Sequence, residues 1–284
     1  MTTPTSPLRY VYAVCRPFDG LPPDGAQGIA GEPPRLLRHH DLVAVVDAVP
    51  AEDFDEGPLR ARMEDLDWLA ATARAHDAVL AALGTVTSPL PLRLATVCRD
   101  DSGVRRLMEE GHDRFVRALD RLDGRVEWGV KVYAEPAPAR RPSDAPRPDG
   151  SPTPETPRRD GSRTPDAPQP GSAATARDGR EYLRRRIQER QGRAARLRRA
   201  EDMCRGLHDR LSAYAEAGAV HPPQDPRLSG TDAVNVLNAA YLVGREHGEE
   251  FVALVRGASQ EGVRVELTGP WAPYSFAGIA EGDA

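Results

Sequence analysis

The sequence contains little cysteine and no long apolar run. Its three cysteines, Cys15, Cys98 and Cys204, are odd in number and far apart. They therefore indicate neither a disulfide framework nor a CxxC metal site, and we predict that they are small core residues. No apolar run is long enough to cross a bilayer, and no apolar segment follows the Thr/Pro-rich residues 1–7. We expect a soluble, cytosolic protein that does not enter a membrane.

The chain also lacks an excess of basic charge. Its formal net charge is -5 at pH 7 and its isoelectric point is near 5.9. A dedicated nucleic-acid binder normally carries an overall positive field, so this class is disfavoured.

The chain also contains a long segment without large apolar residues, which separates two parts of the sequence. Between Pro136 and Arg177 there is no Leu, Ile, Val, Met or aromatic residue. Such a segment has no apolar burial to offset the entropy of ordering, so we predict a disordered, partly polyproline-like linker. The total of 284 residues suffices for two compact domains. The predicted divisions are an N-terminal α+β domain at 8–123, a strand at 124–135, the linker at 136–177 and a C-terminal domain at 178–277.

The remaining sequence alternates between strand and helix patterns. Apolar residues that alternate with polar ones, or that form short β-branched runs, predict strands at 9–15, 42–46, 90–94, 126–132, 233–243 and 263–267. Apolar residues spaced by three and four predict helices from Leu59 to Leu80, from Val104 to Leu122, from Arg180 to Tyr214 and from Glu246 to Ser259. The pattern favours an α+β fold with sandwiches of the ferredoxin-like type, with the strand order left open.

Six segments, in this order along the chain, resemble the gas vesicle protein L/F family. They are residues 10–14 (YVYAV), 65–79 (DLDWL followed by AHDAV), 89–97 (PLPLR followed by TV), 126–132 (VEWGVKV), 241–243 (YLV) and 267–276 (LTGPWAPYSF). Two features depart from the family pattern. Val97 and Cys98 stand where an aromatic is usual, and the Pro-rich insertion is unusually long. The branch, L or F, is left open.

The resemblance implies a two-domain α+β protein whose C-terminal part is a modified ferredoxin-like α/β sandwich. Members of this family are accessory or minor structural proteins of gas vesicles, the hollow protein organelles that provide buoyancy. The implied partners are the small, hydrophobic main shell protein and other gas vesicle accessory proteins, in the cytoplasm at the vesicle. No enzymatic activity and no cofactor is implied.

An enzyme is one alternative. His39, His40 and Asp41 precede a strand, but adjacent strand residues point to opposite faces, so no metal site is assigned to them. His76 and His112 stand beside carboxylates on predicted helices and are expected to be solvated. No nucleophile motif accompanies the Cys, His or Ser residues, so no catalytic residue is assigned.

Binding through the arginine-rich helix is the other alternative. Its eight arginines are Arg184, Arg185, Arg186, Arg190, Arg193, Arg196, Arg198 and Arg199. Acidic residues interleave with them and no stacking aromatic accompanies them, which favours an acidic protein partner over nucleic acid.

Aromatic residues with a polar group are typical of contact surfaces. On this basis the candidate interaction residues are Arg93, Trp128, Trp271, Tyr274 and Phe276. The same aromatics could instead lock the two domains together, and Arg93 could simply cover a strand edge.

Overall fold

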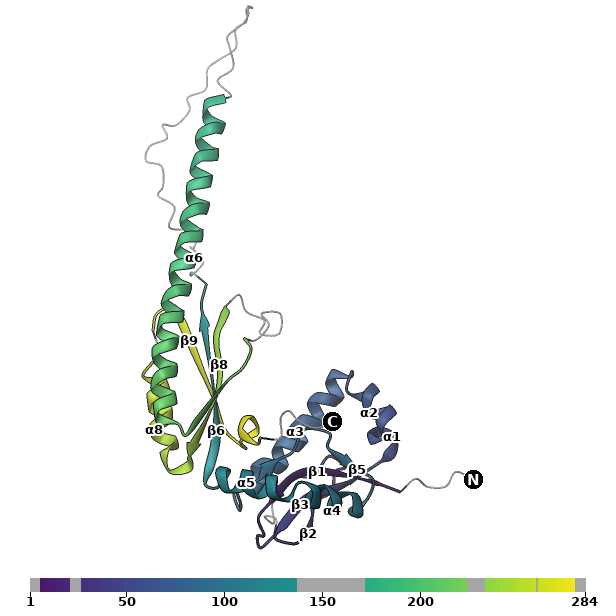
Figure 1. Cartoon of the computed structure of the whole chain (residues 1–284). Helices are drawn as coiled ribbons and strands as arrows, with labels where there is room; N and C mark the ends of the chain where they lie inside the picture. The colour runs from purple at the N-terminus through teal and green to yellow at the C-terminus, as the bar shows by residue number, and fades with distance from the viewer. Residues whose placement is uncertain (1–5, 21–26, 137–171, 224–232, 259, 279–284) are drawn as a thin grey trace, which may run out of the picture.

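The protein is built on two antiparallel β-sheets with helices packed against them (Figure 1). The computed structural model describes residues 6–20, 27–136, 172–223, 233–258 and 260–278. The predicted mixture of helices and antiparallel strands is confirmed. None of the helices in these ranges is both long and apolar enough to cross a membrane.

The first sheet has the order β2-β3-β1-β4, and β5 also pairs with β1. Its strands are β1 (Leu8–Cys15), β2 (Arg35–His39), β3 (Leu42–Val49), β4 (Leu90–Pro91) and β5 (Val97–Cys98). The predictions for β1 and β3 are confirmed, whereas β2, which has no β-branched residue, was missed. The strand predicted over 90–94 is shorter than expected, because the backbone turns where the Thr96 N–H donates to the Arg93 carbonyl.

Helices cover both faces of this sheet. They are α1 (Ala51–Phe54), α2 (Glu56–Arg62), α3 (Leu66–Leu83), α4 (Asp101–Glu110) and α5 (His112–Leu122). One face of the sheet packs against α4 and α5, and the other packs against α1 and α3. The sheet is therefore the middle layer of three.

The single helix predicted from Leu59 to Leu80 is wrong, because the segment is divided between α2 and α3 and its buried face differs from the one that the apolar spacing predicts. The chain breaks before α3, where the Asp65 carboxylate accepts hydrogen bonds from the backbone N–H groups of Asp67 and Trp68. Leu66, at the start of α3, belongs to the apolar spacing that predicted the helix, but it is 77% exposed. The buried residues of α3 are Thr72, His76, Val79, Leu80 and Leu83.

The helix predicted over 104–122 is divided at Gly111, between α4 and α5. A Cβ atom on Gly111 would lie 2.6 Å from the Phe115 ring, so the close approach of this ring requires glycine. The predicted inner face is nevertheless correct, since its residues, from Val104 to Leu122, are buried apart from Leu107, which is half-buried. The Asp100 carboxylate caps the start of α4, where it accepts a hydrogen bond from the Gly103 N–H at 2.8 Å.

The second sheet has the order β7-β8-β6-β9, with every neighbouring pair antiparallel. Its elements are β6 (Arg125–Ala134), α6 (Ser172–Tyr214), β7 (Ala217–Val220), β8 (Val234–Gly244), η2 (Arg245–His247), α8 (Gly248–Arg256), β9 (Val263–Trp271) and η3 (Tyr274–Phe276). The strands predicted at 126–132, 233–243 and 263–267 are confirmed. β7 was missed because it overlaps a Gly/Pro-rich tract. Leu254 was predicted to face inward from α8 but is 38% exposed.

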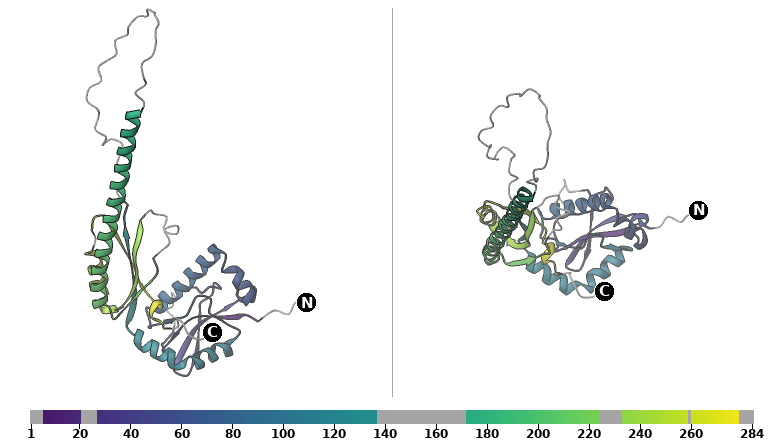
Figure 2. Two further views of the ribbon diagram at one scale, coloured as in Figure 1. Left: turned by 45° about the horizontal axis from the view of Figure 1, so that its top comes forward. Right: turned by 90° about the horizontal axis from the view of Figure 1, so that it is seen from above.

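Helix α6 packs on the second sheet only through the part nearer its end. Its buried residues there are Ala200, Cys204, Leu207 and Leu211, spaced by four, three and four. The earlier part of the helix extends beyond the sheet (Figures 1 and 2). The helix begins at Ser172, inside the predicted linker, and the rest of the linker, at 137–171, lies outside the described residues.

Two apolar residues on the part of α6 that extends beyond the sheet are exposed, although the apolar spacing of the helix predicted that they are buried. Leu183 and Ile187 continue the apolar spacing of the helix, but they are 59% and 53% exposed. We expect Ile187→Ala to change the free energy of unfolding by no more than about 0.5 kcal/mol, because little apolar surface is buried there. Chemical denaturation tests this, with Leu207→Ala, on the buried part of the same helix, as the contrasting variant. A loss of about 2 kcal/mol or more for Ile187→Ala would show that this position is covered in solution.

Candidate interaction surface at the junction of the two sheets

The two sheets share one apolar cluster. Ala240 and Leu242 of β8 point away from α6 and pack with the α4 and α5 side of the first sheet. Phe276 and Ala277, which follow β9, are buried in the same cluster. The two halves of the chain are therefore held together by a continuous hydrophobic core at this junction.

Polar contacts fix residues 272–277, which we call the tail, across the junction. The Tyr274 hydroxyl donates to Asp77 Oδ1 of α3 at 3.2 Å. The backbone N–H and the hydroxyl of Ser275 each donate to the Glu127 carboxylate of β6 at 2.8 Å. The Arg121 guanidinium of α5 donates to the Phe276 carbonyl. The tail thus connects elements from both halves.

The carboxyl groups of the junction lie in a poorly hydrated setting. Burial raises the pKa of Glu127, against the opposing effect of the hydrogen bonds from Ser275. Burial likewise raises the pKa of Asp77, while the hydrogen bond from Tyr274 acts in the opposite direction. The pKa of Tyr274 is raised by burial first and by the nearby Asp77 charge second. These groups hold the tail by hydrogen bonds between α3, β6 and residues 274–275.

Two adjoining hollows, of about 250 and 230 Å³, lie between α3 and the residues around the end of β9. Five residues line both of them: Leu80, Ala81, Pro270, Trp271 and Ala272. We call this surface the junction groove. All five side chains are apolar, and Trp271 is 50% exposed. Charged side chains border them, namely Asp77 and Glu127 in one hollow and Arg125 and Arg245 in the other.

The predicted interaction residues fall in different places. Trp271 and Tyr274 meet at the junction groove, and Tyr274 is 39% exposed. Phe276 is 8% exposed inside the shared core, so it locks the two halves together. Trp128 is half-buried in the second core, with its ring 6.2 Å from that of Phe251. Arg93 is exposed in the turn between β4 and β5.

His76 was predicted to be solvated, and this prediction is wrong. It is 1% exposed on the inner face of α3, and its Nδ1 lies 2.8 Å from the Tyr10 hydroxyl. Burial lowers the pKa of His76 to about 4. His76 shares the buried face of α3 with Val79, Leu80 and Leu83, which pack against the first sheet.

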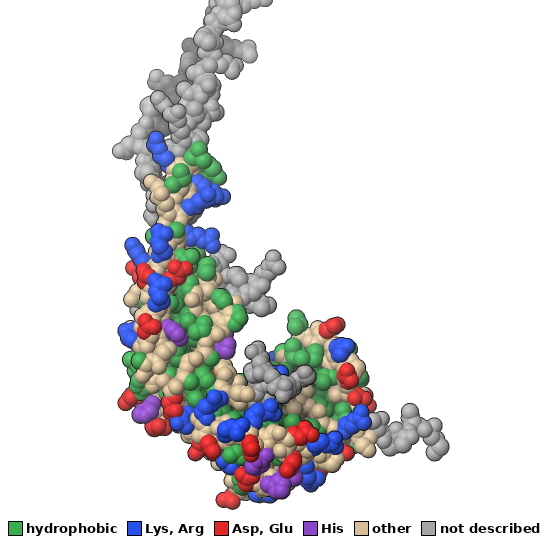
Figure 3. Space-filling view, viewed as in Figure 1, with side chains coloured by type: hydrophobic (Ala, Val, Ile, Leu, Met, Phe, Trp, Pro, Cys, Tyr) green, Lys and Arg blue, Asp and Glu red, His purple; other side chains and the backbone are tan. Residues whose placement is uncertain are grey.

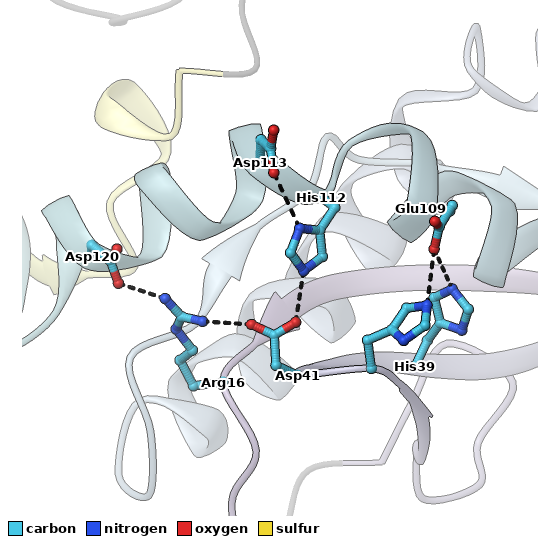
Figure 4. A network of polar contacts seen from close by, with 8 residues as sticks. Arg16, His39, Asp41, Glu109, His112, Asp113 and Asp120 are labelled. Atoms are coloured by element: carbon cyan, nitrogen blue, oxygen red, sulfur yellow. Dashed lines mark hydrogen bonds and ion pairs between the residues drawn. The ribbon is translucent and has the colours of Figure 1, made fainter.

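The turn between β2 and β3 differs from its prediction as well. His39 and His40 do not point to opposite faces, because His40 has a φ of 51° and directs its ring toward α4. Both Nε2 atoms reach Glu109 Oε2, at 2.9 Å from His39 and 3.1 Å from His40. Beside them, the Asp41 carboxylate contacts His112 Nε2 at 2.6 Å and Arg16 at 3.0 Å (Figure 4). The hydrogen bond from His112 lowers the pKa of Asp41 and raises that of His112.

The cysteines and the arginine-rich helix complete the set of predicted features. Cys15 and Cys204 are buried, as predicted, and burial raises the pKa of their thiols to about 12 and about 11. Of the eight arginines predicted for this helix, Arg196 is half-buried and the other seven are exposed on α6. Figure 3 shows these basic side chains along the helix. They lie on a different surface from the junction groove.

Comparison with known proteins agrees with this architecture. The family model described as Gas vesicle synthesis protein GvpL/GvpF matches residues 8–278. Gas vesicle protein L of Streptomyces sp. (strain CB03234) is 64% identical over 279 residues, which cover 98% of this chain and 96% of that protein. Gas vesicle protein F of the same strain is 28% identical over 275 residues, which cover 94% of this chain and 98% of that protein.

Two crystal structures share the fold. GvpF from Anabaena sp. PCC7120 matches with a TM-score of 0.63 at 17% identity, over 98% of this chain and 99% of that one. GvpF from Microcystis aeruginosa matches with a TM-score of 0.57 at 20% identity, over 95% of this chain and 98% of that one. Because the family model spans nearly the whole chain and a 64% identical relative aligns along its length, the chain belongs to the gas vesicle GvpL/GvpF family, as the resemblance predicted.

Proposed function

We propose that this chain is a non-catalytic accessory protein of gas vesicle assembly that binds the hydrophobic main shell protein at the junction groove. The observation that carries the proposal is the half-exposed Trp271 in an apolar groove, on a chain whose family is that of gas vesicle proteins. Large exposed aromatics in apolar surroundings are typical of the central residues of protein interfaces. Binding of this kind requires shape and apolar surface, with no proton transfer.

The position of the groove supports the same proposal. Trp271 ends β9, which is one of the two outer strands of the second sheet, β7 being the other. An outer strand offers backbone N–H and C=O groups to a further extended segment. An extended apolar segment of a shell protein could therefore pair with β9 and place a side chain in the groove. The covered surface would protect that segment from aggregation until it enters the shell.

We further propose a fold type, domain bounds and a family branch for this chain. The second half of the chain runs β-α-β-β-α-β, an order that supports a modified ferredoxin-like sandwich. We propose domains at 8–123 and 178–277, with β6 belonging to the second. The greater identity with protein L than with protein F of one strain supports the L branch. The protein would act in the cytoplasm, at the vesicle, with other accessory proteins as further partners.

Co-purification with the shell protein tests the proposed role. We expect Trp271→Ala to weaken shell-protein binding at least about tenfold, because an interface aromatic of this kind carries a large share of the binding energy. Tyr182→Ala is the matched control, since Tyr182 is an aromatic of similar exposure, 53%, on α6. Equal melting temperatures would show that both variants remain folded.

The same assay separates the alternatives. If Tyr182→Ala abolishes binding and Trp271→Ala retains it, the partner lies on the arginine-rich helix and the groove proposal is wrong. Deletion of residues 137–171 is expected to leave binding intact. Loss of binding on this deletion would move the active region into the Pro-rich segment.

A further inference from the structure

The turn between β2 and β3 and the end of α4 bring three potential metal ligands together. The donor atoms of His39, His40 and Glu109 all lie within 4.8 Å of one another. The two histidine Nε2 atoms converge on a single oxygen, Glu109 Oε2. The residues come from two elements about seventy positions apart in the chain, so their convergence depends on the fold.

The backbone of His40 is unusual in a way that serves this convergence. Its φ of 51° lies in the left-handed region, which few residues other than Gly, Asn, Asp and His adopt. In an ordinary extended strand, His40 would point to the opposite face from His39. The turn therefore holds a less favoured conformation that directs both imidazoles to the same carboxylate.

The distances suit a tetrahedral transition-metal ion. With Zn–N bonds of about 2.0–2.1 Å, neighbouring ligand atoms of a tetrahedral site are roughly 3.3 Å apart. The two His–Glu separations are 2.9 and 3.1 Å, so each pair would need to open by only a few tenths of an ångström. The two imidazole ligand atoms lie within 4.8 Å of each other. Two imidazoles with one carboxylate form a known ligand set for zinc, with a fourth position left for water.

The surroundings leave that fourth position accessible. His40 and Glu109 side chains are each 62% exposed, and they border a hollow of about 510 Å³. Glu110 and Asp113 also line this hollow, together with Arg114 and Arg117. Glu109 lies in the last turn of α4, where the helix carbonyl groups favour a cation. His112 is held by Asp41 and is not needed as a ligand.

We propose that His39, His40 and Glu109 bind one Zn²⁺ ion, which ties the β2–β3 turn to the end of α4. Histidine and acidic side chains gather on this part of the first half in Figure 3. The ion would act as a clamp within the N-terminal half. The site shares no residue with the junction groove, so a failure to bind zinc would not contradict binding of the shell protein at the groove.

Isothermal titration of the full chain with ZnCl₂ tests the site. The protein is prepared without a polyhistidine tag and freed of metal by dialysis against a chelator. We expect one equivalent of Zn²⁺ to bind, with the affinity lowered at least about tenfold by His40→Asn and by Glu109→Gln. Asn tolerates the left-handed backbone of residue 40, and Gln keeps the size of the Glu109 side chain, so both variants are expected to fold.

Two controls make the result specific. Glu110→Gln changes the neighbouring acid, and His247→Asn changes a histidine that also lies beside carboxylates, Glu246 and Glu250. Both are expected to bind zinc like the unmodified chain. With Co²⁺ as a second probe, strong visible absorption typical of tetrahedral coordination is expected to appear, and to disappear in His40→Asn. The absence of one-equivalent binding, or equal binding in His40→Asn and Glu109→Gln, would overturn the proposal.

Discussion

Replacing Phe276 with Ala is expected to lower the free energy of unfolding by about 3–4 kcal/mol, the usual cost of removing a buried aromatic ring. Phe276 is 8% exposed and lies in the cluster that contains residues of the first sheet, α5 and β8. Its removal would leave a cavity where the two halves meet, while the residues around it are held by their own secondary structure. Chemical denaturation measures the loss.

Tyr274→Phe is the matched control for this experiment. It retains the ring and removes only the hydroxyl that donates to Asp77, so a loss near 1 kcal/mol is expected. Limited proteolysis should also cut Phe276→Ala faster than the unmodified chain, because the tail would detach more often. A loss below about 1 kcal/mol for Phe276→Ala would show that the tail does not hold the junction.

Stability is expected to fall as the pH drops from 6.5 to 4, and His76 should account for up to about 3 kcal/mol of this fall. Burial lowers the pKa of His76 in the folded protein to about 4, from 6.5 for a free imidazole. Between these values the unfolded chain binds a proton that the folded chain does not. Above pH 6.5 both states are neutral at this group, so it adds no pH dependence there.

The His76→Gln variant isolates this contribution from those of other titrating groups. Gln can still form a hydrogen bond with the Tyr10 hydroxyl, which also accepts from the Ala95 N–H at 3.0 Å. The difference in unfolding free energy between pH 7 and pH 4 should be smaller in the variant by about 3 kcal/mol. His208→Gln, which alters the half-buried His208–Tyr241 pair, serves as a control for replacing a histidine that contacts a tyrosine in the second sheet. Identical pH profiles for His76→Gln and the unmodified chain would contradict the burial of this imidazole.

Local sequence patterns predicted the elements whose burial is regular. Val126, Val130 and Val132 alternate with more polar neighbours, and β6 is found there. The apolar spacing from Val104 to Leu122 also predicted the inner face of α4 and α5, although it did not reveal the break at Gly111. These predictions succeed because the pattern repeats on one face over many residues.

Predictions failed where a single residue changes the geometry. The Asp65 cap starts α3 where the apolar spacing predicted an unbroken helix, and the positive φ of His40 brings two imidazoles to one side. Neither change leaves a periodic signal in the sequence.

The junction groove was only partly predictable for a different reason. Trp271 and Tyr274 stood out as aromatics in a conspicuous segment, but their neighbours did not. The contact between Tyr274 and Asp77 joins residues 197 positions apart, and Glu127 lies in an ordinary alternating strand. Contacts between such distant residues depend on how the two halves dock, which no local pattern records. Leu80 and Ala81 of α3, which also line the groove, likewise come close to Trp271 only because the two halves dock.

Site-specific photo-crosslinking most directly tests whether the junction groove is the surface that meets the shell protein. A photoreactive phenylalanine analogue is placed at position 271 or, for comparison, at position 182 on α6, and each chain is irradiated with the main shell protein present. We predict a crosslinked product of the two proteins from position 271 and little from position 182. Efficient crosslinking from position 182 with none from position 271 would contradict the account.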